Sequence, residues 1–137
     1  MRNRNIFGPP GIAYVYLSYG THNLLNLVCE PEGVGSAVLI RALHPVEGEE
    51  LMALRRGRSR DLCNGPSRLT QALGIDLAYD GHDLTSVNLT ISEGKRPYGI
   101  VETTRIGISR GTDLPWRYLV EGDRNVSVPP KVIAGRR

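Results

Sequence analysis

Three of the six tyrosines of this 137-residue chain stand close together, in the segment Tyr14-Val-Tyr-Leu-Ser-Tyr-Gly20. Side chains alternate between the two faces of a strand, so Tyr14 and Tyr16 should share a face and Tyr19 should point the other way unless the strand bends. An accessible aromatic ring can stack on a nucleobase and contribute about 1–3 kcal/mol. The alternative is that these tyrosines are ordinary strand-forming residues.

Two polar residues interrupt apolar runs further along, Asn26 between two leucines and Arg41 between Ile40 and Ala42. A buried amide or guanidinium without a partner is costly, so each must find a partner, reach solvent or meet a ligand. If both line a site on one face of a sheet, Asn26 could contact a base edge, and Arg41 could meet a phosphate or an acidic catalytic group. An edge-facing or solvent-reaching side chain is the alternative.

A basic set follows, consisting of Arg55, Arg56, Arg58, Arg60 and Arg68. Charge runs of this kind are usually solvated surface. As a phosphate-contact surface, the set would make binding salt-dependent. Arg68 is the best candidate, because Gly65-Pro66-Ser67 presents backbone donors at an expected helix start, and helix N-termini attract phosphates.

Short elements must position these residues. Strands are expected at 12–19, 23–30 and 36–43, with short links that favour an antiparallel meander, a hairpin link at 20–22 and a central place for the apolar third strand. A helix is expected over 46–56, and a second one is expected to start at 64–67 and stop at Gly74. Further strands are expected near 86–91, 99–108 and 116–121. The predicted fold is α+β: a single domain over 1–137 with a curved, mainly antiparallel sheet and a few flanking helices.

The overall composition is compatible with a polyanionic partner but does not require one, since the net charge is +3 and the sequence pI about 9.1. Cys29 and Cys63 sit among apolar neighbours and are expected to be reduced, buried thiols. The three histidines lie far apart, so no metal site is expected. No apolar run of membrane-spanning length and no signal peptide is present, so a cytoplasmic or nuclear location is expected, nucleoid-associated in a bacterium.

Several of these segments occur together in an order that closely resembles the alkyladenine (3-methyladenine) DNA glycosylase family. They are Phe7-Gly-Pro-Pro-Gly11, the tyrosine segment, Asn26, Ala37-Val-Leu-Ile-Arg-Ala-Leu43, Pro45-Val-Glu-Gly48 and Leu62-Cys-Asn-Gly-Pro-Ser-Arg-Leu69. The resemblance is looser after residue 75, where Arg105-Ile-Gly-Ile108 and Trp116-Arg-Tyr118 still fit. It implies a monomeric base-excision repair enzyme that flips alkylated or deaminated purines out of duplex DNA and hydrolyses the N-glycosidic bond, without metal or organic cofactor.

The resemblance also assigns roles. It matches Tyr16 to the tyrosine that stacks on the flipped base, Tyr14 to a tyrosine lining the site, and Asn26 to an asparagine that helps exclude guanine-type bases. Tyr19 matches the residue that wedges into the duplex, and Arg41 matches the arginine that supports the catalytic acidic group and its water. The DNA contacts that it implies are Thr21 and His22 in the groove and Ser67 and Arg68 at the phosphates.

One family feature has no counterpart in this sequence. The family's general base is a glutamate in a Glu-x-Glu-Ala-Tyr-like segment that precedes Arg2-Asn-Arg4, and a second pocket tyrosine and a base-contacting histidine come from the same segment. The other carboxylates have simpler roles, Glu30 and Glu32 in a turn and Glu47, Glu49 and Glu50 at a helix start. One interpretation is that the chain lacks its N-terminal segment, so that the sheet misses a strand and exposes apolar surface there. The others are a non-catalytic module that binds nucleic acid by tyrosine stacking, and a structural domain.

Overall fold

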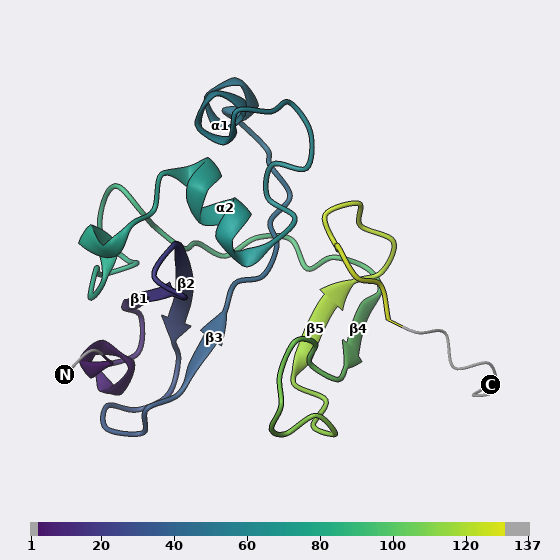
Figure 1. The fold of residues 1–137 in the computed structure, drawn as a ribbon. Coiled ribbons are helices and arrows are strands. Elements are labelled where there is room, and N and C mark those ends of the chain that lie inside the picture. The colour runs from purple at the N-terminus through teal and green to yellow at the C-terminus, as the bar shows by residue number, and fades with distance from the viewer. Residues whose placement is uncertain (1–2, 131–137) are drawn as a thin grey trace. The chain divides into compact units, whose positions relative to one another are not determined.

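The computed structural model describes residues 3–130, which form an α+β fold with antiparallel sheets, as predicted (Figure 1). Contacts divide the chain into two compact units, Met1–Glu93 and Gly94–Arg137, and each is described by itself. The single domain predicted over residues 1–137 stays a prediction. No helix among residues 3–130 is long and apolar enough to cross a membrane.

The first unit is built on a three-stranded sheet of β1 (Ala13–Ser18), β2 (His22–Val28) and β3 (Ala37–Leu39), in the order β1-β2-β3. Both pairings are antiparallel, so the predicted hairpin and meander are confirmed. The central place predicted for the third strand is wrong. β3 is short and lies at the edge of this order, and Val38 within it is 54% exposed.

The run at 36–43 is apolar for a reason other than a central position in the sheet. Its later residues, Ile40 and Leu43, pack against two apolar clusters of the first unit. Ala13, Val15 and Leu25 on one face of the sheet pack with Ile75 and Leu84. Leu62, Cys63, Leu69 and Ala72 form a second cluster, which Leu43 joins. Ile40 contacts both clusters. The apolar residues at 40 and 43 therefore anchor the chain to the helices.

Two helices cover the second cluster. α1 spans Glu49–Arg56, three residues shorter at its start than predicted, because Gly48 in a left-handed conformation (φ 75°) precedes it. α2 spans Pro66–Leu73, with Pro66 in its first turn and Gly74 (φ 69°) ending it, as the sequence indicated. Leu69 and Ala72 are buried, which confirms the predicted apolar face of α2.

The segment around Asp80, which is 65 residues after Val15 in sequence, covers the outer edge of β1. Ala13 donates its backbone N–H to His82 O, and Gly81 donates to Ala13 O. The Asp80 carboxylate accepts the Val15 N–H at 2.9 Å and the Asn5 side-chain amide at 2.8 Å. Two short 3-10 helices flank this contact, η1 (Arg4–Phe7) and η2 (Leu77–Tyr79), and neither was predicted.

The strand predicted near 86–91 is absent from the structure, where these residues form turns and irregular backbone. Local side-chain bonds compete with a strand there. The Asp83 carboxylate accepts from Thr85 N and Thr85 Oγ1, and Ser86 Oγ donates to Asp83 O. Hydrogen bonding to Thr85 lowers the pKa of the Asp83 carboxyl.

The second unit contains a two-stranded antiparallel sheet of β4 (Ile100–Thr103) and β5 (Arg117–Val120), both shorter than predicted. Among the cysteines, Cys63 is buried as expected, and this burial raises the pKa of its thiol. The prediction of a buried Cys29 is wrong: it follows the last residue of β2 and is exposed.

The Asp80 contact should contribute strongly to the stability of the first unit. We expect Asp80→Ala to lower the free energy of unfolding by about 2 kcal/mol, because it leaves the Val15 N–H without its acceptor. Urea unfolding measures the change. Asp83→Ala is the matched control, since the Asp83 carboxylate bonds only within its own turn, and it should cause a smaller loss. Equal losses in both variants would contradict the edge role of Asp80.

Candidate functional site

The face of the sheet opposite the apolar cluster carries the predicted tyrosine pair. Tyr14 and Tyr16 stack with ring centroids 5.3 Å apart and an interplanar angle of 28°. Tyr14 is buried and Tyr16 half-buried. The prediction that both rings share one face is therefore confirmed, and Tyr16 is the more accessible of the two.

Asn26 lies on this same face, because it pairs with Tyr14 in the register of β1 and β2. Its side chain is 7% exposed, and its amide nitrogen donates to Tyr14 O at 3.2 Å. Asn26 is thus a buried, partnered group and not a solvent-reaching one. The bond holds the amide beside the tyrosine pair.

Arg41 follows β3 and is half-buried. The ladder continues past the strand, since Ile40 N donates to Leu25 O at 3.0 Å. Ile40 packs into the apolar clusters, so alternation directs Arg41 to the opposite face, the one that carries Tyr16. The structure confirms that Asn26 shares a face with the tyrosine pair, and the placement of Arg41 on that face stays a prediction.

The hairpin tip presents a second set of predicted residues. Tyr19 and Gly20 have φ angles of 52° and 70°, and Thr21 N donates to Ser18 O at 3.1 Å, which closes a β-turn. Positive φ at both central residues is typical of a type I′ turn, but a bulky residue is rare there. The chain thus turns directly after β1, and this turn leaves Tyr19 97% exposed beside the exposed Thr21 and His22.

A buried hydroxyl connects this end of the sheet to the start of α2. Thr70 Oγ1 lies 2.7 Å from Asn23 O in β2 and 2.9 Å from Ser67 O in the first turn of α2. Ser67 is half-buried and Arg68 is exposed. The link brings the predicted phosphate-contact residues to the strand that begins at His22.

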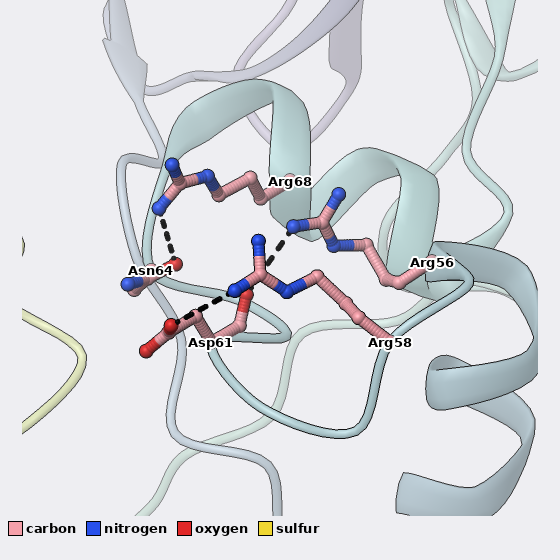
Figure 2. A network of polar contacts seen from close by, with 5 residues as sticks. All are labelled: Arg56, Arg58, Asp61, Asn64 and Arg68. Atoms are coloured by element: carbon pink, nitrogen blue, oxygen red, sulfur yellow. Dashed lines mark hydrogen bonds and ion pairs between the residues drawn. The ribbon is translucent and has the colours of Figure 1, made fainter.

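Three arginines gather around this helix start, as Figure 2 shows. We call Arg56, Arg58 and Arg68 the arginine cluster. Arg68 donates to Asn64 Oδ1 at 2.9 Å, Arg58 pairs with the Asp61 carboxylate at 3.2 Å, and Arg56 donates to Asp61 O at 3.3 Å. Partial burial, then the positive charges of Arg58 and Arg68, lower the pKa of Arg56. The cluster is a site of excess positive charge suited to an anion.

The sequence analysis preferred Arg68 over the loop arginines, and the structure brings Arg56 and Arg58 to it. The sequence feature that could have indicated this grouping is Gly57. It ends α1 at a φ of 65° and reverses the chain between Arg56 and Arg58. Asn64 had been expected as part of a helix cap, but its side chain instead orients Arg68. Among residues 3–130, no three potential metal ligands gather. The functional roles of all these residues stay predictions.

The family model described as methylpurine-DNA glycosylase (MPG) matches residues 1–124. The chain is 67% identical to a protein of Rubrobacter xylanophilus, an alignment that covers 99% of this chain and 72% of the relative. It is 52% identical to one of Rhodopseudomonas palustris (95% and 66% covered) and 50% identical to one of Burkholderia lata (93% and 65% covered). Each relative is named "Putative 3-methyladenine DNA glycosylase". The chain spans about two thirds of the length of the curated relatives that it matches.

One substitution at Tyr19 removes both the backbone strain and the exposed ring, and it should have opposite effects on stability and on DNA affinity. We expect Tyr19→Gly to raise the free energy of unfolding by up to about 1 kcal/mol, because glycine accepts positive φ without strain. The same variant should lower the affinity for duplex DNA with an abasic-site analogue at least about fivefold, as a stacking ring is lost. Urea unfolding and fluorescence anisotropy measure the two effects.

Asn88→Gly is the matched control, since Asn88 is exposed in the same unit with a φ of 72°. It should leave DNA affinity unchanged. A Tyr19→Gly variant that binds DNA as tightly as the parent would show that the tip ring makes no contact.

Proposed function

Since the chain belongs to the methylpurine-DNA glycosylase family, we propose that it forms the base-binding and DNA-binding part of a DNA-3-methyladenine-type glycosylase acting in base excision repair. The substrate is duplex DNA that contains an alkylated or deaminated purine. One observation carries the proposal: the stacked Tyr14 and Tyr16 share a sheet face with the buried Asn26, and the strand that carries them ends in the exposed ring of Tyr19.

Two tyrosine rings, those of Tyr16 and Tyr19, have different roles in base recognition. Flipping a purine out of the stack costs a few kcal/mol, and less at a damaged pair. Stacking on Tyr16 returns about 1–3 kcal/mol, and Tyr19 occupies the gap left in the duplex. Asn26 is held by Tyr14 O and so meets the base edge in one orientation. A base whose exocyclic group clashes with that amide is excluded.

The reaction is hydrolysis at the sugar. An acidic group takes a proton from water, the water oxygen bonds to C1′ of the deoxyribose, the bond from C1′ to the purine nitrogen breaks, and the released base carries the electron pair of that bond. Alkylation gives the purine a positive charge and makes it a better leaving group. Arg41, which follows β3, supports with its charge the acidic group that takes a proton from the water.

The arginine cluster supplies the backbone contact. In the network of Figure 2, the three guanidiniums share one carboxylate, that of Asp61. A bound phosphate would therefore reduce the repulsion among the three positive charges. Asn64 holds the Arg68 head group in place for this contact. Such contacts position the duplex without selecting a sequence.

A second function uses the same rings without chemistry, since the accessible Tyr16 and the exposed Tyr19 can each stack on a base. In that case the chain binds damaged DNA through Tyr16 and Tyr19 and releases no base. The two functions share the same binding face and differ only in chemistry, so one assay separates them.

Base release from duplexes that contain hypoxanthine or an alkylated purine tests the proposal. We expect release above spontaneous depurination, reduced about tenfold or more by Tyr16→Ala and much less by Tyr16→Phe, which keeps the ring. Preferential binding of damaged duplex without release would support the second function. Equal affinity for damaged and undamaged duplexes would rule out both.

The arginine cluster makes a prediction about salt. Arg56→Gln, Arg58→Gln and Arg68→Gln should each reduce the slope of log affinity against log salt by about 1, since each removes one phosphate contact. Gln71→Ala is the control: Gln71 accepts from Arg56 at 2.7 Å but carries no charge, so its loss should leave the slope unchanged. Unchanged slopes in all three arginine variants would place the phosphates elsewhere.

A further inference from the structure

The positive charge of this chain is concentrated in its second unit. Residues 94–137 contain nine Lys and Arg against four Asp and Glu, a net charge of +5. Residues 1–93 contain eight against ten, a net charge of −2. The unit that carries the tyrosine face is thus slightly acidic overall, and the second unit supplies the general attraction to a polyanion.

The β4–β5 sheet of this unit has two different faces. Val101 and Leu119 are partly buried on one of them, where the buried Arg117 donates to Val128 O. On the other face Ile100 and Tyr118 are exposed, and Trp116 lies two residues before Tyr118. Trp116 and Tyr118 are 62% and 65% exposed. We call Ile100, Trp116 and Tyr118 the aromatic face.

A cation lies against the ring of Trp116. The guanidinium carbon of Arg105 is 5.7 Å from the centre of the Trp116 ring, a cation–π contact. This contact orients the indole and places one positive charge beside it. Glu102 is opposite Tyr118 in the register and is exposed, so an anion is repelled at that end and attracted at the Arg105 end.

We propose that the aromatic face and Arg105 form a second nucleic-acid site, which binds single-stranded DNA by stacking an unpaired base on Trp116 and contacting a phosphate with Arg105. Stacking on an exposed ring requires a base whose face is free, and within a duplex both faces of each base are covered by its neighbours. The site therefore prefers single strands to duplexes. It needs no damaged base and is independent of the tyrosine face.

Trp116 is the chain's only tryptophan, so its fluorescence reports on this site directly. The test titrates the full chain with an undamaged oligothymidylate at low salt. We expect saturable quenching of Trp116, and weaker quenching by a blunt duplex of equal length. Anisotropy of the labelled oligonucleotide then gives affinities. Trp116→Ala and Arg105→Gln should each weaken binding about fivefold or more, and Trp116→Phe should weaken it less than Trp116→Ala.

Arg110→Gln is the matched control, because Arg110 is exposed in the same unit and removing it changes the net charge equally. It should weaken binding less than twofold. Absence of quenching, or equal losses in Arg110→Gln and Arg105→Gln, would overturn the proposal, since only general charge would then remain. Tyr16→Ala should leave the quenching unchanged and Trp116→Phe should leave base release unchanged, so this site and the proposed glycosylase function can fail separately.

Discussion

The pairing of Tyr14 with Asn26 across β1 and β2 decides which face every neighbouring side chain takes. Side chains alternate along a strand, so a slip of one residue would turn the tyrosines into the apolar cluster and expose Val15 and Leu25. The β-turn at Tyr19 and Gly20 holds this register from the tip. From the outer edge, Asp80 and its neighbours hold it by bonding to the backbone of β1.

The same register separates the two tasks of the first unit. One face of the sheet packs against Ile75 and Leu84, and the other carries the tyrosine pair and Asn26. The helices add a third group of residues. Because the Thr70 hydroxyl joins Asn23 to Ser67, the start of α2 and its arginine cluster are tied to the strand that leaves the hairpin tip. The residues predicted to bind the base and the phosphates are thus positioned by one continuous set of hydrogen bonds.

Local pattern predicted the parts of this arrangement that depend on neighbours in sequence. Alternation placed Tyr14 and Tyr16 on one face, and the Pro and Gly signals placed α2 correctly. Local sequence pattern failed to predict the structure where contacts between residues distant in sequence determine it. The apolar run at 36–43 looked like a central strand, yet Ile40 packs against the clusters instead. Likewise, no local signal showed that the carboxylate of Asp80 would cap the N–H of Val15.

Three features that lower the stability of the free chain lie at places suited to a nucleic acid. Tyr19 is held at a positive φ that strains a bulky residue by about 1–2 kcal/mol, and the turn needs no ring there. Three like charges in the arginine cluster repel one another, and together with partial burial, the larger cause, this repulsion lowers the pKa of Arg56. Trp116 leaves most of its indole in water. A phosphate would reduce the repulsion among the arginines, and a stacked base would cover the indole of Trp116. The backbone strain at Tyr19 would remain, so it is a cost that the insertion of the exposed ring into a duplex has to offset.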